Sequence, residues 1–143
     1  MLKGFSLIEL LAVLVIIGIL TTIAFPGYRS YITRVHRSDG QTGLLDLAAR
    51  MERHFSENND YQKATIGSGQ ATDVLSNSLS TEGWYILSIT SATDSTYALQ
   101  AIPTGSQATH DTLCQTLTFN SAGSKGIRPG PVGTPTGTPL KCW

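Results

Sequence analysis

The feature that most constrains this chain is a long apolar run close to its N-terminus. From Phe5 to Phe25, Glu9 is the only charged residue. These 21 residues would extend about 31 Å as a helix, close to the ~30 Å thickness of the hydrocarbon core of a membrane. We therefore expect residues 5–26 to form a membrane-spanning helix and residues 27–143 to form one small domain outside the membrane.

The charge of the chain gives no reason to expect attraction to nucleic acid or to an acidic surface. Its formal net charge is +0 and its pI is about 6.8. Beyond Asp60 the basic residues are balanced by acidic ones, so we expect no basic face there; these basic residues are Lys63, Lys125, Arg128 and Lys141. The same part of the chain is rich in Ser, Thr and Gly, as exported domains commonly are.

Two cysteines indicate the compartment of this domain. Cys114 and Cys142 form no CxxC motif, and no histidine or further cysteine lies at zinc-ligand spacing. An unpaired thiol at Cys142, in a segment rich in Pro and Gly, would be exposed and reactive, so we expect the two cysteines to form a disulfide. Such a bond contributes about 3.6 kcal/mol in the loop-entropy model and indicates an oxidising compartment.

The spacing of apolar residues predicts a long helix from residue 5 to about residue 57. Pro26 and the pair Gly40 and Gly43 are weak points, because proline removes a backbone donor and glycine has poor helix propensity. The second half of the helix carries an apolar stripe of Leu44, Leu47, Ala48, Met51 and Phe55.

The rest of the chain reads as a loop, a sheet and a tail, which makes the fold class α+β. We expect a loop over residues 58–83 with a short helical turn around residues 74–79, and a tail over residues 121–143 that is too rich in Pro and Gly for regular structure. An antiparallel sheet of about three or four strands, within residues 84–120, should cover the apolar stripe of the helix. The predicted strands are 84–90, 97–103 and 112–120; in the last, Leu113, Leu117 and Phe119 would share the inner face and Cys114 the outer one.

The stretch "KGFSLIEL" resembles the processing site of type IV prepilins and pseudopilins. In that pattern a short basic leader ends in Gly, then come Phe, a small hydroxyl residue and apolar residues, and Glu stands at the fifth mature position; Gly4, Phe5 and Glu9 match it. The remaining chain is similar to PilE-like minor pilins in "LLDLAARMERHFSENNDY", in the strand region and in the closing "CW". The expected architecture also resembles the type IV pilin fold.

This resemblance implies that residues 1–4 are a leader peptide, which a prepilin peptidase removes between Gly4 and Phe5 before methylating the new amine. It also implies that Glu9 is an assembly contact and that the helix bends at Gly18 and Pro26. The protein would then be a structural subunit, most plainly a minor pilin, that supports pilus biogenesis and pilus-dependent adhesion, twitching motility or DNA uptake. Its partners would be the peptidase and other pilins, first in the bacterial inner membrane, with the large domain periplasmic, and then in an extracellular filament.

Several alternatives stay open at the level of sequence. A type II secretion pseudopilin shares the N-terminal motif, and a pilus-tip subunit could bind DNA or a surface directly. Arginines follow the apolar run, which opposes the positive-inside rule for this orientation, and "TIA" at 22–24 is a passable signal-peptide cleavage site. The arginine series from Arg29 to Arg53 could contact DNA, but we expect it to flank the membrane and to contact neighbouring subunits. Tyr28 and Tyr31 would suit either an aromatic belt or core packing.

No pattern in the sequence favours catalysis, a cofactor or a metal. The three histidines, His36, His54 and His110, are far apart, so we expect them on the surface. Asp111 follows His110, but no nucleophile motif such as GxSxG accompanies the pair. Asp94 and Asp111 are too few acids for calcium, which takes six to eight oxygen ligands. We therefore expect a protein that is not an enzyme.

Overall fold

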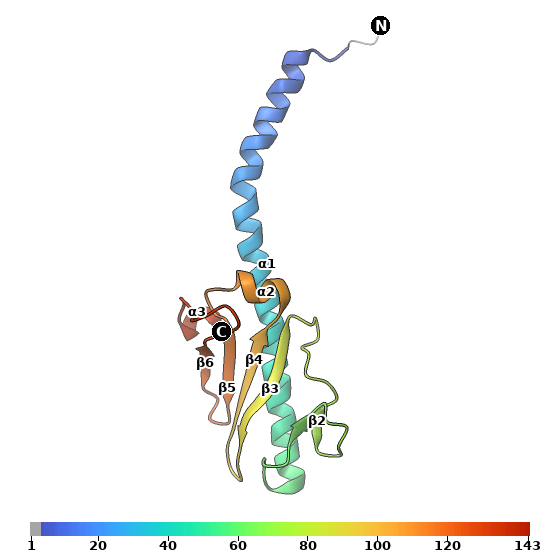
Figure 1. Cartoon of the computed structure of the whole chain (residues 1–143), viewed down its shortest axis with the longest axis vertical. Helices are drawn as coiled ribbons and strands as arrows, with labels where there is room; N and C mark the ends of the chain where they lie inside the picture. The colour runs from blue at the N-terminus through green and yellow to red at the C-terminus, as the bar shows by residue number, and fades with distance from the viewer. Residues whose placement is uncertain (1–3) are drawn as a thin grey trace. The chain divides into compact units, whose positions relative to one another are not determined.

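The computed structural model describes residues 4–143, and it divides the chain into two compact units, Met1–Arg34 and Val35–Trp143. One helix, α1 (Leu7–Asn58), contributes to both units (Figure 1). Residues 1–3 of the predicted leader lie outside the described residues. Part of α1 near the N-terminus is long and apolar enough to cross a membrane, and its apolar side chains are exposed along the first unit.

The second unit contains a four-stranded antiparallel sheet in the order β3-β4-β5-β6. Its strands are β3 (Tyr85–Ala92), β4 (Tyr97–Pro103), β5 (Thr116–Asn120) and β6 (Lys125–Arg128). A small parallel pair, β1 (Thr65–Ile66) and β2 (Asp73–Leu75), and two short helices, α2 (Gly105–His110) and α3 (Pro139–Cys142), complete the unit. β3 and β6 are therefore the two edges of the sheet.

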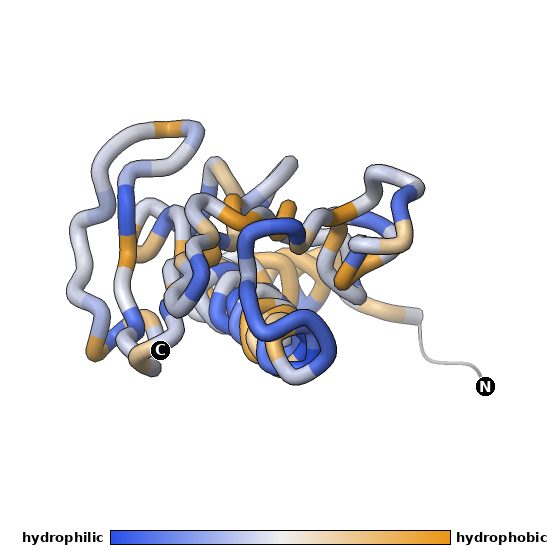
Figure 2. The backbone as a smooth tube through the Cα atoms, turned by 90° about the horizontal axis from the view of Figure 1, so that it is seen from below, coloured by the Kyte–Doolittle hydropathy of each residue, from blue (hydrophilic) through white to orange (hydrophobic). Residues whose placement is uncertain are grey.

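The core of this unit forms where the apolar stripe of α1 meets the sheet. Leu44, Leu47 and Met51 are completely buried, and each such side chain contributes about 1.5–3 kcal/mol when removed from water. They cluster with Tyr85, Leu87, Leu99, Ala101 and Leu117 from the strands. Figure 2 shows both hydrophilic and hydrophobic positions around the helix, as expected for a helix that buries one face.

The two glycines predicted to weaken the helix have a packing role instead. Gly40 and Gly43 are buried within α1, which continues through both positions. A Cβ atom on Gly40 would lie 2.8 Å from the Tyr85 ring, and one on Gly43 would lie 3.2 Å from Leu87. The glycines therefore allow β3 to pack closely against the helix, and this tertiary contact outweighs their poor helix propensity.

The predicted loop over residues 58–83 contains a pair of short strands, and the helical turn expected around residues 74–79 is absent because β2 occupies its start. Asp73 organises this region. Its carboxylate accepts hydrogen bonds from the hydroxyls of Ser68 and Thr65, each at 2.7 Å, and from the amide of Gly69 at 2.8 Å. These donors, the Ser68 hydroxyl first among them, lower the pKa of Asp73 to about 2.

Predictions about the third strand and about the tail were also wrong. The third strand begins at Thr116 rather than at residue 112, because Gln115 adopts a left-handed backbone conformation with φ 48° that breaks the strand. Leu113, predicted on the inner face, is 37% exposed. Cys114 precedes the strand and so has no place on either face of it; it is buried and bonded to Cys142. The tail also contains regular structure, since β6 pairs with β5.

Candidate functional site

The first candidate site is the N-terminal segment of the first unit. Gly4 and Phe5 precede α1 and are exposed, Phe5 by 85%. The carboxylate of Glu9 accepts a hydrogen bond of 2.9 Å from the backbone amide of Ser6. Glu9 is the third residue of α1, so this bond is one half of a capping box and satisfies an amide at the start of the helix. The S-x-x-E spacing in "SLIE" could have revealed it.

The predicted bends in this helix stay predictions. α1 is continuous through Gly18 and through the backbone of Pro26. Thr21 bonds the carbonyls of Ile17 and Gly18 at 2.8 and 2.9 Å, an arrangement that accompanies slight bending in helices.

The second candidate site is built where the chain returns to the sheet after β6. Cys114 and Cys142 form a disulfide with Cα atoms 5.6 Å apart, and both residues are buried. The side-chain amide of Gln41, on α1, donates to the Cys142 carbonyl at 2.8 Å. The Trp143 indole donates to the Gly126 carbonyl at 3.0 Å, which fixes the end of α3 beside β6.

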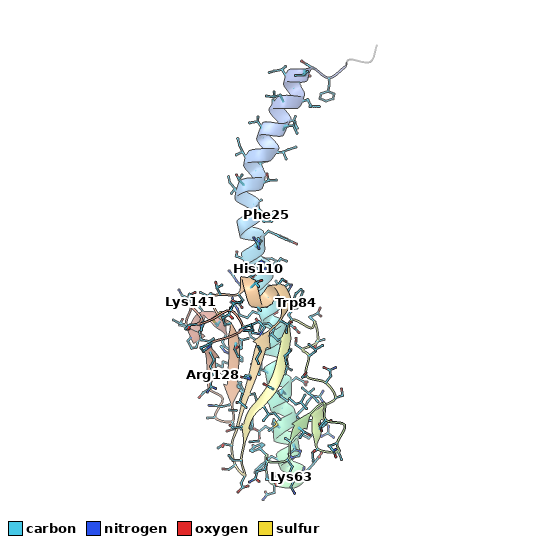
Figure 3. All side chains as sticks on the ribbon, viewed as in Figure 1. Phe25, Lys63, Trp84, His110, Arg128 and Lys141 are labelled. Atoms are coloured by element: carbon cyan, nitrogen blue, oxygen red, sulfur yellow. A yellow bond between two sulfur atoms is a disulfide. The ribbon has the colours of Figure 1, made fainter. Side chains whose placement is uncertain are left out.

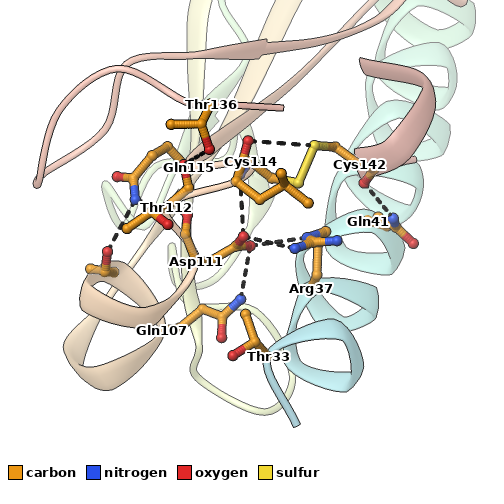
Figure 4. A network of polar contacts seen from close by, with 12 residues as sticks. Thr33, Arg37, Gln41, Gln107, Asp111, Thr112, Cys114, Gln115, Thr136 and Cys142 are labelled. Atoms are coloured by element: carbon orange, nitrogen blue, oxygen red, sulfur yellow. Dashed lines mark hydrogen bonds and ion pairs between the residues drawn. A yellow bond between two sulfur atoms is a disulfide. The ribbon is translucent and has the colours of Figure 1, made fainter. Parts of the chain in front are cut away.

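A buried polar network supports the disulfide (Figure 4). The Asp111 carboxylate accepts two bonds from the Arg37 guanidinium, at 2.9 and 2.7 Å, and one from the Cys114 amide at 3.2 Å. The Gln107 side chain donates to it at 3.1 Å and the Tyr85 hydroxyl at 3.4 Å. Burial raises the pKa of Tyr85, so its phenol stays protonated and able to donate.

This network gives Asp111 a structural role. The Asp111 side chain is 0% exposed and that of Arg37 8%, and a buried carboxylate already saturated by donors is unavailable for calcium or for acid–base chemistry. Asp94 is exposed and pairs instead with Gln62. Among the described residues no three His, Cys, Asp or Glu side chains gather as a metal site would require.

One edge of the second unit carries basic side chains. We call β6 and α3, with the exposed side chains of Lys125, Arg128 and Lys141, the basic edge (Figure 3). No acidic residue occurs in the sequence from 112 to 143, and the preceding acid, Asp111, is buried and neutralised by Arg37. The expectation of no basic face came from a count over the whole domain, and such a count hides this run of residues 112–143 with three exposed cations and no acid.

Within residues 4–143, which the structure describes, no ion pair joins an acid to the three cations of the basic edge. The ion pairs among the described residues join Arg37 to Asp111, Arg50 to Asp46 and Arg53 to Glu57, and the latter two lie on the surface of α1. Lys125 lies 5.1 Å from the centroid of the Trp143 ring, which orients its side chain toward α3. The arginines of α1 beyond residue 36 are therefore paired with acids, whereas the basic edge is not.

The histidines depart from prediction at two positions, His54 and the half-buried His36. His54 is buried, 8% exposed, and its Nδ1 lies 3.4 Å from the Asn58 side chain. His36 stacks on Trp84, with ring centroids 3.7 Å apart. His110 is exposed, as expected.

Two family models match the chain. Residues 3–25 match the prokaryotic N-terminal methylation motif, and residues 26–118 match the family described as type IV minor pilin ComP, DNA uptake sequence receptor. The chain belongs to this family of type IV minor pilins. The predicted recognition as a type IV pilin is thereby confirmed, and the family is structural and not enzymatic.

Individual relatives match the chain in sequence over shorter stretches. The chain is 41% identical over 59 residues to the type IV major pilin protein PilA of Myxococcus xanthus, covering 41% of this chain and 27% of the relative. It is 37% identical over 68 residues to the type IV major fimbrial protein FimA of Dichelobacter nodosus, covering 48% of this chain and 42% of the relative. The matches therefore span less than half of these curated relatives.

A solved structure shows the fold. The non-core minor pilin PilV of Neisseria meningitidis superposes with a TM-score of 0.53 at 19% identity, covering 76% of this chain and 98% of PilV. The pilin fold is thus confirmed: a long N-terminal helix, a four-stranded antiparallel sheet and a C-terminal disulfide. A place in the membrane or in a pilus is typical of the family.

The buried pair of Arg37 and Asp111 is tested by its contribution to the free energy of unfolding. Arg37→Met should lower the free energy of unfolding by about 3–5 kcal/mol, because it leaves the Asp111 carboxylate buried without a counter-ion. Replacing both partners, as Arg37→Met with Asp111→Leu, should recover much of this loss. Urea unfolding of the full chain in detergent, followed by tryptophan fluorescence, measures both effects.

Arg53→Ala is the matched control, since its pair with Glu57 is exposed, 80% and 62% at the two side chains, and should contribute less than about 1 kcal/mol. An Arg37→Met variant as stable as the Arg53→Ala control would contradict the anchoring role of the buried pair.

Proposed function

We propose that this minor pilin binds double-stranded DNA, and that the basic edge is its contact surface. The family description names a DNA uptake sequence receptor, which supports DNA as the ligand class. The observation that carries the placement is the run of residues 112–143 with three exposed cations and no acid. The matched region ends at residue 118, so the placement rests on charge and not on the family match.

The chemistry of the basic edge suits a phosphate backbone. Lys and Arg side chains without acidic partners neutralise phosphates and release condensed counter-ions, which supplies most of the affinity of a protein for DNA. Because β6 is an edge strand, the cations beside it are accessible without rearranging the sheet. The Trp143 ring is half-buried, with Lys125 over it and Phe119 packed at 6.0 Å. These contacts make Trp143 a poor platform for stacking an unpaired base, which favours duplex DNA.

We also propose the steps that bring the subunit to a filament. A prepilin peptidase would cut the exposed junction of Gly4 and Phe5, and the apolar part of α1 would hold the subunit in the inner membrane, with the second unit periplasmic. The new amine would then pair with Glu9 of a neighbouring pilin during assembly. The capping bond from Ser6 supports this sequence of events, because it gives Glu9 a partner before assembly and lowers the cost of a carboxylate in lipid.

DNA binding is tested by the salt dependence of affinity. Arg128→Ala and Lys141→Ala should each raise the Kd for duplex DNA and each reduce the slope of log K against log salt by about 1, as the loss of one phosphate contact requires. The measurement is fluorescence anisotropy of a labelled duplex with the full chain in a neutral detergent, over a series of salt concentrations.

The matched control is Lys63→Ala. Lys63 is also an exposed cation without an ion pair among the described residues, but it lies near the end of α1, away from Arg128 and Lys141 (Figure 3). Equal losses from all three substitutions would overturn the placement at the basic edge. Absence of any salt-dependent binding by the wild-type chain would overturn the DNA-binding function itself.

Glu9 is tested by incorporation into filaments. Glu9→Val should leave cleavage and membrane insertion intact but reduce incorporation by more than about tenfold, because an amine buried without its carboxylate costs about 3–5 kcal/mol. Each variant is expressed beside wild-type sister pilins, and sheared filaments are probed for it.

Glu9→Gln separates charge from capping, because the amide oxygen can still accept the Ser6 hydrogen bond while the charge is lost. Both variants should be excluded from filaments. Normal incorporation of Glu9→Gln would show that Glu9 acts as a helix cap and not as the charged assembly contact.

A further inference from the structure

Leu140 stands out on the basic edge. It is 91% exposed, more than any other large hydrophobic side chain described in the second unit; Leu79 at 52% and Val132 at 50% follow it. A single exposed leucine is ordinary on a protein surface. Leu140 differs from an ordinary exposed leucine in its sequence neighbourhood, because the next residue is Lys141 and no acid occurs from residue 112 to residue 143.

The backbone that carries Leu140 is firmly held. The Lys141 amide donates to the Thr138 carbonyl at 3.0 Å, and the Trp143 amide donates to the Pro139 carbonyl at 3.1 Å. Cys142 is bonded to Cys114, and its carbonyl accepts the Gln41 side chain. Pro139 restricts its own φ at the first position of α3. Leu140 is therefore an apolar side chain presented to solvent from a fixed turn.

We propose that Leu140 enters a groove of the bound duplex and contacts base edges, so that it contributes sequence discrimination while the neighbouring cations bind phosphates. This inference rests on the proposed DNA-binding function. Phosphate contacts position a protein on DNA but carry no sequence information, whereas apolar contacts in a groove respond to thymine methyl groups and to the ease of separating a base step. Lys141 follows Leu140 directly, and α3 contacts β6, which carries Lys125 and Arg128. These cations favour the approach of a polyanion whose grooves expose apolar base atoms.

The experiment measures the affinity of the protein for duplex DNA and its discrimination between two DNA sequences. The wild-type full chain, in neutral detergent, first selects a preferred duplex from a random-sequence library, and a scrambled duplex of the same composition serves as the reference. The ratio of the two Kd values is then measured for wild type and for Leu140→Ser. The ratio should fall by about fivefold or more, as expected when one base-pair contact is lost, and the salt slope should stay unchanged because no phosphate contact is removed.

Three control variants accompany Leu140→Ser. Val132→Ser removes another exposed apolar side chain from the same segment and should leave the ratio unchanged, while Leu140→Ile keeps the apolar contact and should retain most of the discrimination. Lys141→Ala should weaken binding to both duplexes similarly.

The outcomes separate this inference from the proposed function. If Leu140→Ser discriminates as well as wild type, or if the wild type binds both duplexes equally, the inference is wrong while DNA binding stands. If the wild type shows no salt-dependent DNA binding, both fail together.

Discussion

The buried pair of Arg37 and Asp111 is the interaction on which the second unit depends. It joins α1 to the segment after α2, residues separated by 74 positions in sequence, and the Asp111 carboxylate also receives the amide of Cys114. Cys114 in turn holds Cys142, so one carboxylate links the helix, the sheet and the last turn of the chain. Because a buried charge is costly without its partner, this arrangement favours a single position for α3 beside β6.

The surface chemistry follows from the same pair. Neutralising Asp111 inside the fold leaves Lys125, Arg128 and Lys141 without a nearby acid in the sequence, and the overall charge of zero conceals this local excess. The arginines of α1 that attract attention in the sequence are used differently: Arg37 is buried and Arg50 and Arg53 pair with acids on the helix. A neutral protein thus presents one basic edge, which agrees with its membership of a DNA-receptor family of minor pilins.

Local patterns predicted much of this structure. Helical spacing placed the end of α1 within one residue of Asn58, the strand predicted over 97–103 is β4, and the N-terminal motif led to the pilin family. Interactions between distant residues could not be read in this way. The left-handed conformation of Gln115 stops β5 from beginning earlier, and Asp111 finds its partner only through the folded chain. The basic edge was missed because charges were counted over the whole domain, although the run of residues 112–143 without an acid can be read from the sequence.

Hydrogen–deuterium exchange of the full chain, with and without duplex DNA, tests most directly whether the basic edge is the DNA-binding surface. The account predicts that DNA slows amide exchange in peptides from residues 125–143, with no change in peptides covering β1 and β2, because bound phosphates cover β6 and α3 and restrict their opening. Protection confined to residues 58–80, with residues 125–143 unaffected, would contradict it.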